Sequence, residues 1–280
     1  PPRSTLFPYT TLFRSRSAFL KPIKFKGTNF EKWASFKSVK FEDECNFYGA
    51  NIVGDLSFEW ASFENLINLQ TLCAERNVNF NNAKIGESAT FSFLDAYLGR
   101  LFITRGQLEN HLESHIQKDF KKARHEYGLL KNNFREVNEY DREDWAYLME
   151  KRMERMSLKV KGVRSALNRF FNWSALDVAC GYGTKPFNIF VTSFVVLLAF
   201  SLFYFILGSH FHPPSGSAGS TQLPALESLL VSFRTFTNAS VGGWEANEES
   251  FMNYVMMLES FLGFFVMTVL VVTFSRKVIR

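Results

Sequence analysis

An eleven-residue repeat constrains the fold of this chain more than any other feature of its sequence. From residue 25 the chain divides into seven units: FKGTNFEKWAS, FKSVKFEDECN, FYGANIVGDLS, FEWASFENLIN, LQTLCAERNVN, FNNAKIGESAT and FSFLDAYLGRL. The first column contains Phe25, Phe36, Phe47, Phe58, Leu69, Phe80 and Phe91, and the sixth contains Phe30, Phe41, Ile52, Phe63, Ala74, Ile85 and Ala96. The fourth column is small or apolar in every unit.

Alternating steps of five and six residues fit neither a straight helix nor a straight strand. Five helical residues turn through about 500°, which would separate the two Phe columns by roughly 140°. An odd step along one strand would place them on opposite faces. A chain that turns a corner about every five residues points each column inward, as in a β-solenoid. We therefore predict a solenoid with a helical interruption in its fifth unit, LQTLCAERNVN, and an ordinary aromatic-rich β domain as the alternative.

The repeat resembles the Phe-rich variety of pentapeptide repeats across residues 25–101. That resemblance implies a cytoplasmic domain for regulation, sensing or assembly, which would bind a protein or ligand. Some pentapeptide proteins are described as DNA mimics. Residues 25–101 carry ten acidic and seven basic residues, a net charge of 7 − 10 = −3. Because this charge is small for a duplex mimic, no nucleic-acid partner is expected.

Two long apolar stretches nearer the C-terminus have the length of membrane-spanning helices. The first, FNIFVTSFVVLLAFSLFYFIL (187–207), carries no charge and would span about 31 Å as a helix. The second, YVMMLESFLGFFVMTVLVVTF (254–274), carries only Glu259. Lys and Arg flank the pair on its outer sides, and only Arg234 lies between the two stretches. The positive-inside rule therefore predicts a multi-pass inner (plasma) membrane protein with both termini in the cytoplasm.

The connection between these stretches contains a third, shorter apolar segment. It opens with the flexible sequence HFHPPSGSAGSTQ, continues with LPALESLLVSFRTFT and leads into TNASVGGWE. Pro224 suits the first turn of a helix, and apolar residues then recur at helical spacing from Leu226 to Phe236. About fourteen residues are too few to span a bilayer, so we predict a re-entrant helix. Irregular backbone after it survives at membrane depth only if protein buries it or it lines a water-filled path.

This order of elements resembles the pore domain of the potassium-channel superfamily. In that family the carbonyl groups of a T-V-G-Y-G run replace the hydration shell of the ion. Aligned without a gap, the resemblance places a filter at Ser240, Val241, Gly242, Gly243 and Trp244, preceded by Thr237. Trp244 then takes the place of a glycine, where a positive φ would impose a steric cost. Either the outer half of the filter has another shape, or Gly243 is the last glycine in a shifted register.

The resemblance also implies roles for charged residues near this segment. Glu245, Glu248 and Glu249 would form rings that attract cations at the outer mouth of a symmetric assembly. A carboxylate inside a membrane helix is costly, so Glu259 should face protein or water. We predict that Arg234 pairs with Glu259 and braces the pore helix. In the alternative, Glu259 is protonated or bonds to backbone, and Arg234 reaches outward to the first of the three outer carboxylates.

Glycines mark two further positions near the apolar stretches. Gly263, within the second stretch, is a candidate hinge. The sequence CGYGTKP (180–186) contains a literal GYG, but it lies before the first stretch with no pore helix ahead of it. We predict a turn there that ends one helix, with Pro186 opening the next. CGYGTKP also resembles a juncture in bacterial channels that carry a pentapeptide-repeat domain.

Charged, helical sequence joins the repeat to the first apolar stretch. Residues 104–158 are predicted to form a cytoplasmic helical hairpin broken at NEYD, with Asp141 as an N-cap. Residues 159–186 mix apolar and basic residues, which predicts an amphipathic interfacial helix and turn. His111 and His115 lie four residues apart without a Cys or carboxylate partner, so solvated histidines are favoured over a metal site. For His210 and His212 in the outer loop, metal binding and pH sensing are the alternatives to simple loop exposure, which is favoured.

The chain thus divides into five predicted segments of a multidomain membrane protein. Residues 1–15, PPRSTLFPYTTLFRS, resemble the translation of a sequencing adapter and are set apart as a non-native tail; a genuine basic tail is the alternative. A pentapeptide-repeat β-solenoid (16–103), the helical linker (104–158), the interfacial segment (159–186) and a pore domain of two transmembrane helices with a re-entrant pore helix (187–280) follow.

No catalytic constellation accompanies these segments. The sequence has no phosphate loop, nucleophile elbow or HExxH, and Cys45, Cys73 and Cys180 form no CxxC pair. We therefore expect no enzyme and no cofactor or bound metal, but a homotetrameric cation channel in a lipid membrane that passes K⁺ or Na⁺. Two helices per chain cannot surround a central filter alone. The alternative is a non-conducting, membrane-anchored scaffold or sensor that binds a cytoplasmic partner through the solenoid.

Overall fold

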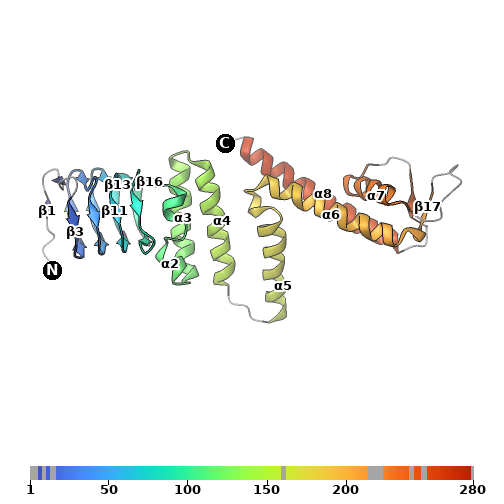
Figure 1. The fold of residues 1–280 in the computed structure, drawn as a ribbon, viewed down its shortest axis with the longest axis horizontal. Helices are drawn as coiled ribbons and strands as arrows, with labels where there is room; N and C mark the ends of the chain where they lie inside the picture. The colour runs from blue at the N-terminus through green and yellow to red at the C-terminus, as the bar shows by residue number, and fades with distance from the viewer. Residues whose placement is uncertain are drawn as a thin grey trace. The chain divides into compact units, whose positions relative to one another are not determined.

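The chain folds as two compact units, residues 1–161 and 162–280, which are described separately. The structure, a computed structural model, describes residues 17–158, 162–213, 223–239, 243–246 and 251–278, and the backbone of 6–7 and 11–12. Short strands and then helices make up the first unit, and helices dominate the second (Figure 1).

The repeat region is a four-sided β-solenoid built from parallel strands. Ile23 pairs with Cys45 and Cys45 with Ile67, so one coil advances 45 − 23 = 22 residues, or two repeat units. Two walls are the sheets β3-β7-β11-β14 and β4-β8-β12-β15, and β13 joins the other two walls into one sheet. The strands are β1 (Leu6–Phe7), β2 (Thr11–Leu12), β3 (Ala18–Phe19), β4 (Ile23–Lys24), β5 (Asn29–Phe30), β6 (Ala34–Ser35), β7 (Lys40–Phe41), β8 (Cys45–Asn46), β9 (Asn51–Ile52), β10 (Leu56–Ser57), β11 (Ser62–Phe63), β12 (Ile67–Asn68), β13 (Cys73–Asn79), β14 (Lys84–Ile85), β15 (Phe91–Ser92) and β16 (Tyr97–Phe102).

The walls also extend into the N-terminal segment that we expected to stand outside the fold. β1 pairs with β5, and β2 pairs with β6, both in parallel. β1 and β2 therefore pair with backbone groups at the N-terminal edge of the first full coil, as extended chain readily does at an open sheet edge.

The aromatic columns point inward, as predicted, and their rings stack along the solenoid. Phe47 is fully buried, and its ring centroid lies 4.8 Å from that of Phe25, one coil earlier. Phe41 and Phe63 stack at 4.8 Å with an interplanar angle of 2°. Aromatic pairs at these separations add about 0.5–1.5 kcal/mol each to the stability gained from burial alone.

Two opposite corners of the coil have left-handed backbone, one in each of six successive repeat units. The residues with positive φ are Gly27, Ser38, Gly49, Trp60, Thr71 and Asn82, each eleven residues after the last. Gly and Asn tolerate this conformation, whereas Trp60 and Thr71 adopt it at a steric cost. The repeat therefore fixes the backbone at both corners even where the side chain opposes it.

Two expectations about the later units were wrong. The fifth unit has no helix, because β13 continues as a strand across a corner and pairs with both β9 and β10. In the seventh unit the columns shift by two residues, since Phe91 pairs with Ile67 at a separation of 91 − 67 = 24. The two extra residues lie in the turn before β15. Phe93 and Leu98, both buried, therefore take the inward positions, and Ala96 is only half-buried.

Helical residues close the C-terminal end of the solenoid. Glu126 Oε1 accepts a 2.7 Å hydrogen bond from the backbone N–H of Phe93, and Asn133 Oδ1 accepts one of 2.9 Å from the N–H of Leu101. These side chains replace the carbonyls that another coil would supply. The helices are α1 (Arg105–Leu108), α2 (Glu113–Ile116), α3 (Phe120–Glu136) and α4 (Tyr140–Ser157). The linker thus also caps the solenoid, a role that the sequence analysis missed.

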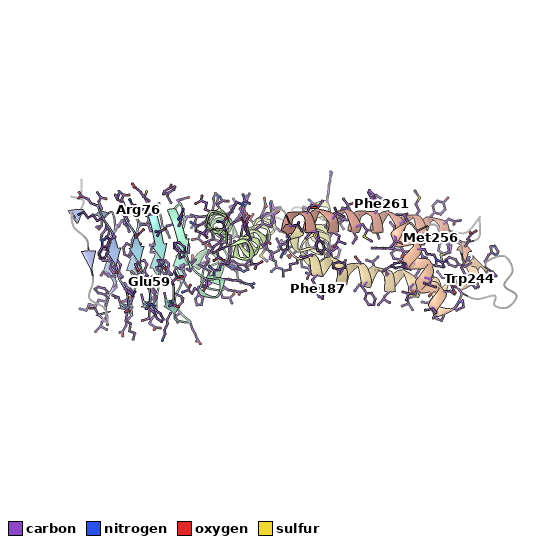
Figure 2. The ribbon with its side chains drawn as sticks, turned by 90° about the horizontal axis from the view of Figure 1, so that it is seen from above. Glu59, Arg76, Phe187, Trp244, Met256 and Phe261 are labelled. Atoms are coloured by element: carbon purple, nitrogen blue, oxygen red, sulfur yellow. The ribbon has the colours of Figure 1, made fainter. Side chains whose placement is uncertain are left out.

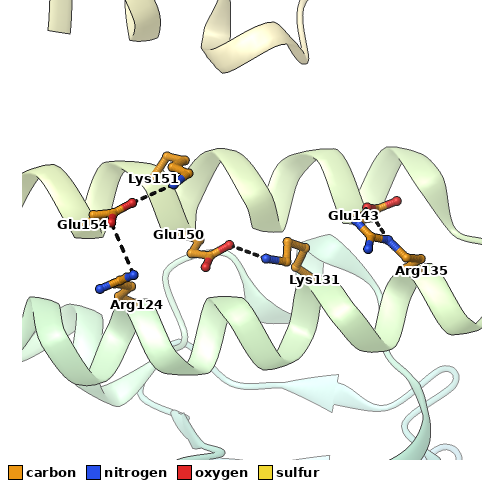
Figure 3. Close-up of polar contacts among 7 residues, drawn as sticks. All are labelled: Arg124, Lys131, Arg135, Glu143, Glu150, Lys151 and Glu154. Atoms are coloured by element: carbon orange, nitrogen blue, oxygen red, sulfur yellow. Dashed lines mark hydrogen bonds and ion pairs between the residues drawn. The ribbon is translucent and has the colours of Figure 1, made fainter. Parts of the chain in front are cut away.

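The predicted hairpin is formed by α3 and α4 alone. Left-handed residues Asn110 and Lys118 break the preceding segment into separate turns, and Asp119 caps α3 by accepting from Lys122 N–H. The N-cap of α4 is Glu139, so the expected cap at Asp141 was wrong by two residues. Ion pairs line the two helices in Figure 3: Arg124–Glu154 at 3.3 Å, Lys131–Glu150 at 2.8 Å and Arg135–Glu143 at 2.7 Å, with Lys151–Glu154 at 2.8 Å within α4.

The second unit contains two helices that are long and apolar enough to cross a membrane. Mean hydropathy reaches 2.5 in α6 and 2.3 in α8, and only 17% and 11% of those windows are buried. Most of each window is thus exposed within the described unit, whereas the core helix of a soluble protein is mostly buried. The elements are α5 (Val163–Phe171), the π-helix η1 (Asn172–Val178), η2 (Gly181–Gly183), α6 (Pro186–Ile206), η3 (Gly208–His210), β17 (Phe211–His212), α7 (Ala225–Thr237), β18 (Glu245–Ala246) and α8 (Met252–Val278).

The literal GYG is a turn, as predicted. Gly181, Tyr182 and Gly183 have φ of 54°, 51° and 77°, so three successive residues are left-handed. Pro186 is the first residue of α6. This turn joins the π-helix to the first membrane-length helix.

Candidate functional site

The short helix α7 lies against both α6 and α8 with its serine face. Ser228 and Ser232 are 1% and 0% exposed, and Val231 between them is also buried. Of the apolar positions that predicted this helix, Phe236 is also buried, whereas Leu226 and Phe233 are 70% and 52% exposed. Within the described residues of the second unit, α7 therefore has an apolar face that no other element covers.

Glu259 of α8 is fully buried, which confirms that it faces protein. Its Oε2 accepts a 2.6 Å hydrogen bond from Tyr204 Oη of α6, and its Oε1 accepts one of 2.5 Å from Ser232 Oγ of α7. The sequence analysis missed Tyr204 and Ser232. Isolated polar side chains in strongly apolar helices were the available signal, because such groups need partners at membrane depth.

The predicted ion pair between Arg234 and Glu259 does not form. Glu259 has two hydroxyl donors instead, and the Arg234 guanidinium lies against Gly243. A Cβ built on Gly243 would lie 1.8 Å from Arg234 Nη1. No ion pair between Arg234 and Glu245 occurs among the described residues either. Glycine at position 243 thus leaves the space that the guanidinium occupies.

The C-terminal end of α7 is closed by a left-handed residue. Asn238 has φ 55° and ψ 32°, and the N–H of Ala239 donates to the Arg234 carbonyl at 3.0 Å. Thr237 turns back along the helix, and its Oγ1 donates to the Phe233 carbonyl at 2.7 Å. Ser260 Oγ of α8 donates to Asn238 Oδ1. The partial negative charge at this helix end favours a nearby cation.

The predicted filter is described only at its outer end. Ser240, Val241, Gly242, Glu248 and Glu249 lie outside the described residues. Trp244 is not left-handed, and its half-buried ring packs on a small core that includes Tyr204, Val231 and Met252. Figure 2 places Trp244 and Met256 at the same end of the unit, while Phe187 and Phe261 point away from their helices. No steric cost of a positive φ therefore arises at Trp244.

A short antiparallel ribbon holds the chain that follows Trp244. Phe211 of β17 pairs with Ala246 of β18, and His212 pairs with Glu245. Glu245 is exposed, while Phe211 is buried in the same small core as Tyr204. The ribbon thus ties the end of α6 to the segment that precedes α8.

Gly263 lies where α8 crosses the last turn of α7. A Cβ at this position would lie 2.0 Å from the carbonyl oxygen of Phe236, which no real structure tolerates. The structure thus gives Gly263 a packing role, and the hinge remains a prediction.

Among the described residues, none of the histidines considered above belongs to a group of three or more His, Cys, Asp or Glu side chains that could hold a metal ion. His111 Nδ1 donates to the Ala89 carbonyl at 2.7 Å, and His115 Nδ1 lies 2.9 Å from Tyr127 Oη. Both are half-buried with partners, so the expectation of solvated side chains was wrong, and burial lowers the pKa of His115. The His210 ring packs edge-on against Phe251, while His212 is exposed in β17.

Comparison of the chain with protein-family models, with curated proteins and with solved structures found no match.

Proposed function

We propose that this chain is the subunit of a homotetrameric channel that conducts monovalent cations passively across the inner membrane. The observation that carries the proposal is α7, a helix of 13 residues that packs between two membrane-length helices. At 1.5 Å per residue it extends about 20 Å, too short for a bilayer of about 30 Å. A re-entrant pore helix followed by a filter has this arrangement.

The chemistry around the end of α7 suits a cation. The C-terminal end of a helix carries partial negative charge, and Gly243, Trp244 and the exposed Glu245 follow it in sequence. The backbone carbonyls of the SVGGW segment would replace water around the ion, and Glu245 would contribute to an acidic ring at the outer mouth.

The exposed face of α7 supports assembly. Leu226, Leu230 and Phe233 are exposed on the side opposite the buried serines. A neighbouring subunit would cover this face, and four copies would place four α7 ends around one axis. The solenoid would then serve on the cytoplasmic side as a regulatory or assembly domain for a protein or ligand.

Ion flux through reconstituted protein tests the proposal. The purified full chain is placed in liposomes with asymmetric K⁺ and Na⁺, and the current and its reversal potential are measured. We expect a cation-selective current that Gly242→Ala abolishes or changes without loss of the tetramer. The matched control is Gly106→Ala, because a Cβ at Gly106 meets no atom within 4 Å.

Two outcomes would count against a channel. If the wild-type tetramer carries no current, the chain is a membrane-anchored scaffold or sensor. If Gly242→Ala leaves both conductance and reversal potential unchanged, the ion does not pass along the SVGGW segment.

A further inference from the structure

The contacts of Glu259 differ from those of an ordinary buried charge. The carboxylate receives hydroxyl donors from two other helices, Tyr204 on α6 and Ser232 on α7, and forms no ion pair with a cationic side chain among the described residues. All three residues are 0% exposed. Three helices that follow one another along the chain thus meet at one side chain.

Further hydroxyl groups extend this contact along the interface of α6 and α7. Ser201 Oγ and Ser228 Oγ lie 3.2 Å apart, and Ser228 Oγ also donates to the Ala225 carbonyl at 2.8 Å. Ser232 Oγ lies 3.1 Å from the Leu197 carbonyl, but its single hydrogen serves the closer carboxylate. Ser201 and Ser228 thus form a second polar contact between α6 and α7, and Ser232 is the serine that contacts Glu259.

We propose that Glu259 is a positioning residue that fixes α7 between α6 and α8. The Tyr204–Glu259–Ser232 contact, called here the carboxylate lock, sets the depth and rotation of α7. No water is present in the core of a bilayer to replace a lost partner, so α7 cannot slide or rotate without leaving polar groups unpaired. Apolar packing alone would not select one rotation, because the serine face and the apolar face of α7 are both compatible with burial.

The lock acts on the segment that follows α7. Ser232 is two residues before Arg234, whose guanidinium contacts Gly243. A rotation of α7 would move this guanidinium and the left-handed cap at Asn238 together. In this respect the inference rests on the proposed function: Glu259 would influence which ion passes while lying away from the ion path.

Amide hydrogen exchange of the full chain in lipid nanodiscs tests the lock without requiring a current. Glu259→Leu should speed exchange in α7 about tenfold or more, because it removes the shared acceptor. Glu259→Gln keeps an oxygen for Tyr204 and an amide for Ser232, so its exchange should stay near that of the wild type. Tyr254→Phe is the matched control, since Tyr254 lies on α8 and is 79% exposed.

A double-mutant cycle separates the lock from general packing. Tyr204→Phe alone should speed exchange in α7, and adding it to Glu259→Leu should have little further effect, because both remove one contact. Additive effects, or unchanged α7 exchange in Glu259→Leu, would overturn the lock. If Glu259→Leu does not fold, the test is a comparison of amide exchange in α7 between Tyr204→Phe and Tyr254→Phe. Equal α7 exchange in these two variants overturns the lock.

The permeability ratio of K⁺ to Na⁺ then tests the positioning role. It should shift in Glu259→Leu and return toward the wild-type value in Glu259→Gln. An unshifted ratio in Glu259→Leu, with current present, would overturn the positioning role and leave the channel standing. If the exchange effects of Tyr204→Phe and Glu259→Leu are non-additive but the wild-type chain carries no current, the lock is supported and the channel is refuted.

Discussion

The substitution Gly263→Ala measures how closely α8 packs on α7. Its new Cβ would lie 2.0 Å from the Phe236 carbonyl oxygen, and Cβ contacts below 3.0 Å do not occur, so α8 must withdraw by about 3.0 − 2.0 = 1.0 Å. Overpacking costs about 1–3 kcal/mol, and the upper value applies because a main-chain carbonyl cannot rotate away. Alanine also stabilises a helix interior by about 1 kcal/mol relative to glycine, which offsets part of this cost. We expect a net loss of about 2 kcal/mol.

Thermal unfolding of the full chain in detergent, with amide exchange in α7, is the measurement. Gly263→Ala should unfold at a lower temperature and lose protection in the last turn of α7. Gly106→Ala is the control, and its stability should be unchanged or slightly higher. A variant with wild-type stability and wild-type α7 exchange would refute the close contact. If Gly263→Ala changed only the rate of gating, the residue would act as a hinge instead.

Three further predictions concern the solenoid. Phe47→Asp would place a carboxylate against Phe25 and Phe58, so we expect a loss on the order of 5 kcal/mol and no cooperative melting by circular dichroism; a wild-type curve would show that the column does not point inward. Trp60→Asn should stabilise by about 1 kcal/mol, because Trp60 is left-handed and 59% exposed; an unchanged or lower Tm would contradict this. Burial raises the pKa of Glu126, so its contribution to stability is full below its ordinary pKa of 4.5 and is lost as pH rises through the raised value. In urea unfolding from about pH 4 to about pH 8, Glu126→Gln should make the free energy of unfolding depend less on pH. The same pH dependence in the wild type and the variant would argue against a role of Glu126.

Periodicity in the sequence was sufficient to predict the elements whose side chains repeat. The Phe columns identify inward positions, because a side chain that recurs at a fixed spacing has the same environment in every unit. The uncharged length of residues 187–207 and 254–274 likewise predicts two membrane-length helices. In both cases the signal is local or regular, so one sequence contains it.

Irregular positions escaped this reasoning. The fifth unit looked helical because its first and sixth columns hold no aromatic residue. It forms the strand β13 because strands of the coils before and after it pair with it. The shift of two residues before Phe91 is invisible in a fixed period of eleven and appears only in strand pairing. The capping role of Glu126 and Asn133 depends on a helix folding back over residues about thirty positions earlier.

The sequence alone determined that Glu259 needs a partner, and only the tertiary structure decided which one. A carboxylate in an apolar helix must be satisfied, and Arg234 was the obvious choice because opposite charges attract at any separation. Hydrogen bonds depend on distance and angle, and the packing of α6, α7 and α8 brings the hydroxyls of Tyr204 and Ser232 within reach instead. Composition and spacing in the sequence show which groups require partners. The rotation and depth of each helix decide which partners they meet, and many weak contacts set that rotation and depth together.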